Sequence, residues 1–204
     1  MPSLLLGLFV CLLESLEADS LCDGSRLRSP NGHGEVFMQK SVNLANFEAA
    51  PEQFILVFTY DGNRPLIANA LDSGYNLVAW TGSSRFLIAA TGLHTDPVMS
   101  VIYTSNGTLA SAKIDWEPIV AFGRKCWPWD GSGPLIHDSI LEVCSGAKDS
   151  VYCLYQKWRN PMGLFVPVKI SIKDRSHPER VTFTFLKPVW SNDNPHLADL
   201  LKNQ

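Results

Sequence analysis

The sequence has little charge and no long apolar run. Charged residues make up 18% of its 204 residues, and its 17 Lys and Arg, set against 20 Asp and Glu, form no basic block. Because phosphate backbones are bound by basic faces, nucleic acid is not an expected partner. The most apolar segment, Leu4–Leu13, is shorter than the roughly 20 residues that span a bilayer. We therefore expect no stable membrane span.

The motifs of common enzymes are also missing. The sequence contains no Gly-x-Ser-x-Gly nucleophile elbow, no His-Glu-x-x-His zinc motif and no Gly-rich phosphate loop between a strand and a helix. It has no Cys-x-x-Cys pair, which argues against a structural zinc site. We expect a non-catalytic protein with no metal and no cofactor. A hydrolase with paired carboxylates is the less favoured alternative, because the separation of two carboxylates cannot be read from a sequence.

The N-terminus resembles a secretory signal peptide, although it lacks a basic start. Leu4–Leu13 fits the apolar core of such a peptide, and Ala18-Asp19-Ser20 supplies small residues for cleavage. We expect residues 1–20 to be removed and the protein to be secreted. Cleavage there would remove three of the 20 acidic residues and none of the 17 basic ones, which leaves the chain close to neutral. A buried first strand or helix and an uncleaved anchor are the alternative interpretations.

The cysteines agree with an oxidising compartment. The chain has 5, of which Cys11 lies in the expected signal peptide, and the others are Cys22, Cys126, Cys144 and Cys153. Four cysteines allow two disulfides in three connectivities, and the sequence does not choose among them. Asn106-Gly107-Thr108 is an N-glycosylation sequon, so we expect a glycan on Asn106.

From Glu35 onward the sequence is a succession of short β-like runs. Val, Ile, Phe, Tyr and Thr dominate these runs, while Gly, Pro, Asn and Asp separate them. Asn106-Gly107 and Asp61-Gly62 are hairpin signals, and the one helix that we expect is His196–Lys202. We expect a single all-β domain of short antiparallel strands and hairpins over residues 35–204, preceded by an irregular arm at 21–34. The expected strands are Val36–Val42, Phe54–Tyr60, Leu77–Trp80, Phe86–Ala90, Met99–Thr104, Leu109–Ile114, Ile119–Phe122, Val151–Gln156, Phe165–Ile172 and Val181–Leu186.

Two segments, Gly107–Ile114 and Gly163–Ile170, share a pattern of glycine, five intervening residues, lysine and isoleucine. Each follows a short β run with a tyrosine, which itself follows an aspartate in a turn. The tyrosine and aspartate are Tyr103 and Asp96 in the first copy, and Tyr155 and Asp149 in the second. The pattern predicts a strand, a tight turn and a second strand that carries the lysine. We infer an internal repeat over about residues 60–144 and 145–190.

The order of these features resembles the DM-nine repeat family of invertebrate proteins over about residues 60–186. The turn with Asp149, the strand Leu154-Tyr155 and the hairpin that carries Lys169 stand at the corresponding positions of that family's repeat. The resemblance implies an all-β fold in which two interleaved repeats form a sandwich, prism or barrel. It also implies lectin-like binding of mannose-type sugars through the turn aspartate and hairpin lysine of each copy, namely Asp149 with Lys169 and Asp96 with Lys113.

The segment Cys126-Trp127-Pro128-Trp129-Asp130-Gly131 is the most unusual in the chain. Exposed indole rings stack on the apolar faces of sugars, so Trp127 and Trp129 are candidates for a binding platform. The alternative is that both rings cover the core, which is the commoner fate of tryptophan.

Together these features predict a secreted protein that recognises a carbohydrate or a glycoprotein without catalysis. The alternative is a carrier that holds a small apolar ligand inside a β-barrel. An interior cavity would distinguish the carrier from a protein with a filled core and an exposed polar site. The sequence leaves the oligomeric state open, with a homodimer as one option.

Overall fold

The structure is a computed structural model of the chain, and it describes residues 20–21, 26–41, 53–61, 64–70, 76–91, 98–128, 137–159 and 161–202. The expected signal peptide, apart from Ser20, lies outside the described residues. Three of the candidate residues, Cys22, Asp96 and Trp129, also lie outside them.

The described chain folds into three antiparallel sheets, each built on a meander of four consecutive strands, which confirms the all-β class. The N-terminal sheet contains β2 (Arg26–Arg28), β3 (Gly34–Ser41), β4 (Gln53–Tyr60) and β5 (Leu66–Ala70). The middle sheet contains β6 (Asn76–Trp80), β7 (Phe86–Thr91), β8 (Val98–Ser105) and β9 (Thr108–Ile114), with β1 (Ser20–Leu21) on its edge beside β6. The C-terminal sheet contains β10 (His137–Ser145), β11 (Ser150–Arg159), β12 (Met162–Ile172) and β13 (Val181–Phe185), with β14 (Val189–Ser191) also paired to β12.

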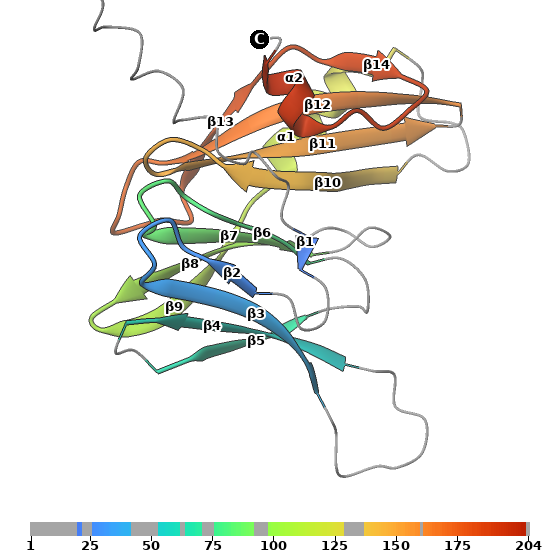
Figure 1. Cartoon of the computed structure of the whole chain (residues 1–204). Coiled ribbons are helices and arrows are strands. Elements are labelled where there is room, and N and C mark those ends of the chain that lie inside the picture. Colours follow the sequence, from blue (N-terminus) through green and yellow to red (C-terminus); the bar gives the residue numbers. More distant parts are fainter. Residues whose placement is uncertain are drawn as a thin grey trace, which may run out of the picture.

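The three sheets are stacked as layers, with the middle sheet between the other two (Figure 1). Successive side chains of β6 point to opposite faces, so Leu77 and Ala79 enter one core while Val78 and Trp80 enter another. A strand buried on both faces is apolar throughout rather than alternating, and β6 and β7 have this composition. All three described sheets are open, so the stack is a layered sandwich and not a barrel.

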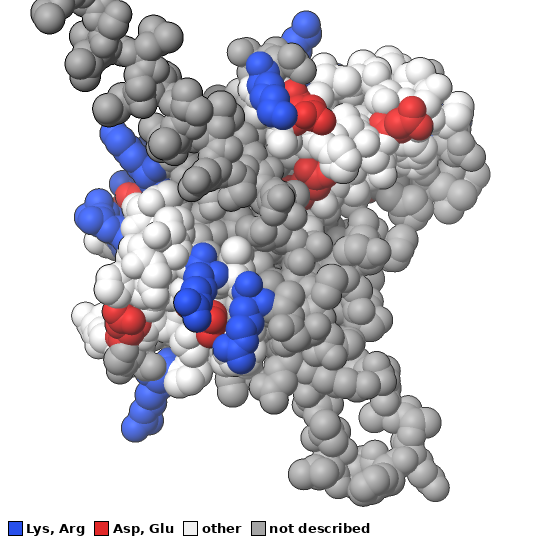
Figure 2. All heavy atoms as spheres, in the orientation of Figure 1, with Lys and Arg blue, Asp and Glu red and all other residues white. Residues whose placement is uncertain are grey.

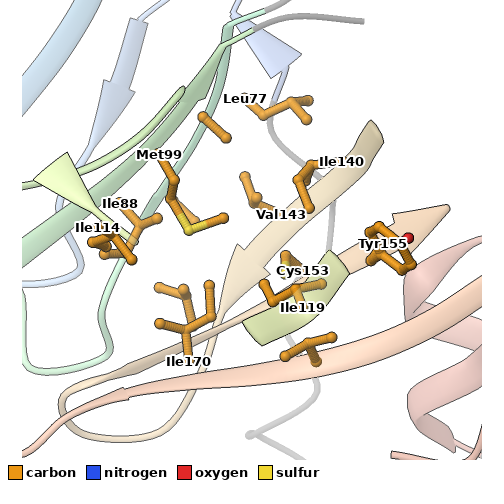
Figure 3. Packing of buried hydrophobic residues seen from close by; sticks show 14 of the residues in the cluster. Leu77, Ile88, Met99, Ile114, Ile119, Ile140, Val143, Cys153, Tyr155 and Ile170 are labelled. Atoms are coloured by element: carbon orange, nitrogen blue, oxygen red, sulfur yellow. The ribbon is translucent and has the colours of Figure 1, made fainter. Parts of the chain in front are cut away.

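The larger core lies between the middle and C-terminal sheets (Figure 3). Met99 and Ile114 of the middle sheet face Cys153 and Ile170 of the C-terminal sheet, and Ile119 joins them from α1 (Glu117–Cys126). All of these side chains are buried. A third, smaller cluster covers the outer face of the C-terminal sheet, where α2 (Leu197–Lys202) packs. The C-terminal sheet is therefore covered on both faces, and the predicted C-terminal helix is confirmed.

The expected strand Ile119–Phe122 is wrong, because this segment belongs to α1. Pro118 stands in the first helical turn, where its missing N–H leaves no bond unmade, and basic residues fill the last turn. Ile119, Val120 and Gly123 are buried, a spacing that places them on one helix face. The short apolar run therefore reflects a buried stripe of a helix rather than a strand.

The region expected to be an irregular arm contains β2, which pairs with β3. Leu27 packs into the core between the N-terminal and middle sheets. Arg26 and Arg28 both pair with Glu35 on β3. The strand is short, with two charged residues of three, so its sequence resembles a loop. The expectations also omitted β1, β5, β10 and β14.

Both hairpin signals are confirmed. Asn106 and Gly107 form the turn between β8 and β9 with φ values of 50° and 74°, a left-handed conformation that Asn and Gly favour. Asp61 directly follows β4 in the connection to its partner β5.

The two Gly-x5-Lys-Ile segments both lie on second strands of hairpins, but those strands are not equivalent. Gly107–Ile114 forms the last strand of the middle meander, while Gly163–Ile170 lies in the third strand of the C-terminal meander. Each meander also forms a sheet of its own, so the copies are not interleaved within one sheet. The structural repeat in the described chain is the four-stranded meander, whose boundaries differ from those inferred from the sequence.

The first turns of the N-terminal and middle meanders have the same hydrogen bonding. In the β2–β3 turn, Ser29 Oγ accepts a hydrogen bond from the Gly34 N–H at 2.7 Å, and in the β6–β7 turn Thr81 Oγ1 accepts one from the Phe86 N–H at 3.3 Å. The residue three positions after this hydroxyl is left-handed in both turns, and Lys148 has the same conformation in the β10–β11 turn. The φ values are 77° at Gly32, 59° at Ser84 and 54° at Lys148.

These three turns, which we call the turn stack, are bonded to one another. The Asn31 N–H donates to Ser84 Oγ at 2.9 Å, which joins the N-terminal and middle sheets. The Gly82 N–H donates to the Gly146 carbonyl at 3.0 Å, and the Ser83 N–H donates to the Lys148 carbonyl at 2.8 Å. The turn of the middle sheet therefore holds both outer sheets in register.

Gly82→Ala tests the turn stack. A Cβ at position 82 would lie 2.6 Å from the Gly146 carbonyl oxygen, so the two turns would have to separate. We expect the variant to lose about 2 kcal/mol of unfolding free energy in urea denaturation, the range typical of steric conflict in a packed site. Ala147→Ser, on an exposed residue of the neighbouring turn, is the control and should change stability by less than about 0.5 kcal/mol. A Gly82→Ala protein as stable as the control would contradict the role of the stack.

Candidate functional site

Asp149, the turn aspartate of the second sequence copy, lies in the turn stack. Its carboxylate accepts a hydrogen bond from the Ser83 hydroxyl and lies 3.7 Å from the Arg175 guanidinium. Its carbonyl accepts a hydrogen bond from the Ile172 N–H at 2.9 Å. The side chain is 19% exposed. Asp149 therefore takes part in holding the C-terminal sheet against the middle sheet.

The two hairpin lysines lie on different sheets. Lys169 stands opposite Tyr152 in the register, and its ammonium is 5.8 Å from the centre of that ring. Lys113 is exposed on β9, opposite Ser100. The described contacts of Asp149 are thus with Ser83 and Arg175 rather than with Lys169. The partner expected for Lys113, Asp96, is outside the described residues.

Trp127 directly follows α1 and is buried in the larger core, with 7% exposure. Its ring lies 5.2 Å from that of Trp190, which is on β14 and is 38% exposed. Trp127 therefore covers the core, as the alternative interpretation of this segment expected, whereas the neighbouring Trp190 ring is exposed to solvent. The sequence analysis did not identify Trp190 as a candidate site residue, because it lies far from Trp127 in the chain.

A buried ion pair lies beside these rings. The Lys157 ammonium is 3.1 Å and 3.3 Å from the two carboxylate oxygens of Asp138, and 5.9 Å from the centre of the Trp127 ring. The Lys157 side chain is 7% exposed and that of Asp138 is 25% exposed. Tyr155 donates a hydrogen bond from its hydroxyl to the same carboxylate. We call Trp127, Trp190, Lys157, Asp138 and Tyr155 the tryptophan cluster.

Strand register places this cluster. Lys157 stands opposite both Asp138 on β10 and Leu164 on β12, and Leu164 in turn stands opposite Trp190 on β14. Directly opposed residues share a face of the sheet, so the charged pair and Trp190 face the side on which α1 and Trp127 lie. Gly123 of α1 allows Tyr155 to pack there, because a Cβ at that position would collide with the Tyr155 ring.

Burial controls the titration of two groups near this face. The pKa of Tyr155 is raised above its usual value mainly by desolvation and further by its hydrogen bond to Asp138, although the charge of Arg124 opposes the shift. Tyr155 therefore remains a hydrogen-bond donor at neutral pH. Desolvation, helped by the neighbouring Cys144, also raises the pKa of the Cys153 thiol, which makes Cys153 a poor nucleophile.

The expected disulfides are wrong for the cysteines that the structure describes. No disulfide joins Cys126, Cys144 and Cys153 to one another. Cys153 points into the larger core, whereas Cys144 points into the cluster under α2 on the other face of the sheet. Alternation along paired strands therefore keeps these two sulfurs apart. Asn106, the expected glycosylation site, is exposed in its hairpin turn.

The tryptophan cluster combines an exposed indole ring, a partly exposed carboxylate and a buried ammonium. An indole offers an apolar face, a carboxylate accepts hydrogen bonds, and an ammonium donates them. Such a surface suits a ligand with an apolar face and a rim of hydroxyl groups. Among the described residues, no group of three or more His, Cys, Asp and Glu side chains is placed to hold a metal ion.

No family model matches the chain, and no similar protein was found among curated proteins or solved structures. Neither described helix has the length and apolar composition needed to cross a bilayer.

Removing Asp138 and removing Lys157 from the buried ion pair should lower the stability of the protein by different amounts. Asp138→Asn should lower the free energy of unfolding by about 3 kcal/mol, because it leaves the buried Lys157 ammonium without a counter-charge. Lys157→Met should lower it by only about 1 kcal/mol, because the Asp138 carboxylate is more exposed and keeps the hydrogen bond from Tyr155.

Urea denaturation of both variants, with Glu117→Gln as control, tests this asymmetry. Glu117 pairs with Arg124 on the surface, with both side chains more than half exposed, so its loss should change stability by less than about 0.5 kcal/mol. The account of the pair is wrong if Asp138→Asn is no more destabilising than this control.

Proposed function

We propose that this protein is a secreted, non-catalytic carbohydrate-binding protein and that the sugar binds at the tryptophan cluster. The observation that carries the proposal is the exposed Trp190 ring, which lies against Trp127 next to the ion pair of Asp138 and Lys157. Trp190 and Met162 are the exposed large hydrophobic side chains of the described chain. An exposed indole beside a carboxylate is more specific than a lone apolar side chain on a surface.

The chemistry of the cluster supports a sugar ligand. The Trp190 face can stack on the C–H face of a pyranose ring. Asp138 already accepts bonds from Tyr155 and Lys157, and these fix the orientation of its carboxylate. A carboxylate offers about four acceptor positions and these three bonds use all but one, which remains for a sugar hydroxyl. A fixed acceptor next to a stacking surface lowers the entropy lost on binding.

The same features favour this proposal over the two alternatives. A carrier of the expected kind needs a closed barrel with an open interior, whereas the described sheets are open and the space between them is filled by core side chains. Glycoside hydrolysis uses a pair of carboxylates across one cleft, whereas the cluster pairs its Asp138 carboxylate with a lysine.

Trp190→Ala should weaken sugar binding at least about tenfold, which corresponds to about 1.4 kcal/mol of lost stacking. A glycan array that includes mannose-type sugars identifies the ligand, and titration calorimetry measures the dissociation constant. Met162→Ala is the matched control, because Met162 is 36% exposed, close to the 38% of Trp190, and should bind like the wild type.

Two further variants separate this site from the one that the sequence motifs imply. If Lys113→Ala and Lys169→Ala weaken sugar binding while Trp190→Ala does not, the sugar binds at the hairpin lysines and the tryptophan cluster is not the site. A blank array, on which a control lectin binds normally, would contradict carbohydrate binding itself. Circular dichroism confirms that each variant is folded.

A further inference from the structure

The β2–β3, β4–β5, β6–β7, β8–β9, β10–β11 and β12–β13 connections lie at one end of the stack, whereas the β11–β12 turn lies at the other (Figure 1). The turn stack joins the β2–β3, β6–β7 and β10–β11 turns there. The β4–β5 connection lies beside the β2–β3 turn, because the Asp61 N–H donates to the His33 carbonyl. The β12–β13 connection lies beside the β10–β11 turn, because the Ile172 N–H donates to the Asp149 carbonyl. Antiparallel order brings the β8–β9 turn to the same side. We call this side the hairpin end.

The hairpin end carries exposed cations from every sheet. The N-terminal sheet contributes one before β5, the middle sheet one in its β6–β7 turn, and the C-terminal sheet the others in its β10–β11 and β12–β13 connections. These residues are Arg64, Arg85, Lys148, Lys173, Arg175 and Arg180. Since stacked sheets lie about 10 Å apart, the cations are spread over about 20 Å across the layers. Figure 2 shows Lys and Arg side chains exposed on the side where these turns lie, with some Asp and Glu among them.

The acidic groups at this end are already engaged. Asp61 pairs with His33 and Glu179 with His177, while Asp149 accepts from Ser83 and pairs with Arg175. Asp174 accepts a hydrogen bond from the Ser176 N–H. By contrast, no described residue forms an ion pair with these exposed cations: Arg64, Arg85, Lys148, Lys173 and Arg180. Their positive charge is therefore directed to solvent.

Hydrogen bonds of the turn stack hold the backbone that presents Arg85 and Lys148. Arg85 follows the left-handed Ser84, whose hydroxyl is bonded to the N-terminal sheet, and Lys148 is itself left-handed with its carbonyl bonded to Ser83. A rigid scaffold loses little entropy on binding, so several weak charge contacts can add up on one extended ligand. The chain as a whole has a net charge of −3, which makes a positive end a local feature rather than a consequence of composition.

We propose that the hairpin end binds a linear sulfated polysaccharide. The sulfates of such a chain would meet cations on successive layers, and release of its counterions would favour binding, as it does for other polyanions. The described residues of the hairpin end lack the exposed apolar side chains that proteins use to bind nucleic acid bases or to insert into anionic membranes. The exposed large hydrophobic side chains of the described chain, Met162 and Trp190, lie at the opposite end of the C-terminal sheet. The described hairpin end thus offers no exposed Phe, Tyr or Trp ring to stack a nucleic acid base and no apolar wedge for a membrane.

This proposal is independent of the neutral sugar site at the tryptophan cluster. Lys157 stands roughly 26 Å along β11 from Asp149, so the two surfaces face different ends of the molecule. Each surface can fail its test without affecting the other.

Heparin affinity of the purified protein tests the proposal. We expect the wild type to be retained at about 50 mM salt, with a dissociation constant that rises steeply as salt increases. The triple variant Arg85→Ala, Lys148→Ala and Lys173→Ala should bind at least about tenfold more weakly and lose about two units of slope in log Kd against log salt. The side chains of these three residues make no described ion pair, so the fold should survive their removal.

A matched control removes the same charge elsewhere. Lys113, Lys125 and Lys202 are exposed away from the hairpin end, and their triple alanine variant should keep the affinity and the salt slope. Trp190→Ala should also leave heparin binding unchanged. The proposal is overturned if the wild type is not retained at low salt, or if the control triple loses as much affinity as the hairpin triple. Equal affinity for desulfated heparin, single-stranded DNA or phosphatidylserine vesicles would also overturn it, since the site would then not select a sulfated polysaccharide.

Discussion

The hydrogen bonds between the first turns of the three meanders are the contacts on which the rest of the structure depends. Each sheet forms mainly from consecutive strands, but it needs a neighbouring sheet to bury its apolar face. The sheets must therefore be held in a fixed relative position for the apolar side chains between them to pack. The bonds from the β6–β7 turn to Asn31 on one side and to Gly146 and Lys148 on the other provide that position. The same bonds orient the charged turn residues and use the Asp149 carboxylate as a structural partner.

The C-terminal sheet therefore presents two different chemistries at its two ends. At the hairpin end, polar turns hold exposed cations on a rigid scaffold. At the other end, α1 stops at Cys126 and brings Trp127 against Trp190 and Lys157. Burial of Lys157 is tolerated because Asp138 supplies both a counter-charge and hydrogen-bond acceptors. The ion pair and the rings thus form one packed unit, in which the outward-facing parts are the Trp190 ring and part of the Asp138 carboxylate.

Local sequence patterns predicted much of the fold but little of the candidate site. The β-branched runs, the Asn106-Gly107 turn and the C-terminal helix follow from short-range preferences that the tertiary structure does not override. Ile119–Phe122 was assigned to a strand because a short apolar run looks alike in a strand and in a buried helix stripe. Trp127 was a candidate from its unusual neighbours, but the proximity of Trp190, Lys157 and Asp138 depends on strand register, which no local pattern encodes. The disulfide expectation failed for Cys144 and Cys153 because cysteine counting ignores which face of a strand each residue occupies.

Hydrogen–deuterium exchange with the tightest-binding neutral glycan tests the location of the proposed sugar site most directly. The account predicts that the glycan slows exchange in β14 around Trp190 and in the segment at the end of α1 around Trp127, while exchange in the turn at Gly146–Asp149 stays the same. Protection confined to that turn and to the strands that carry Lys113 and Lys169 would contradict the account, because the sugar would then bind at the end of the molecule that we assign to structural and charged contacts.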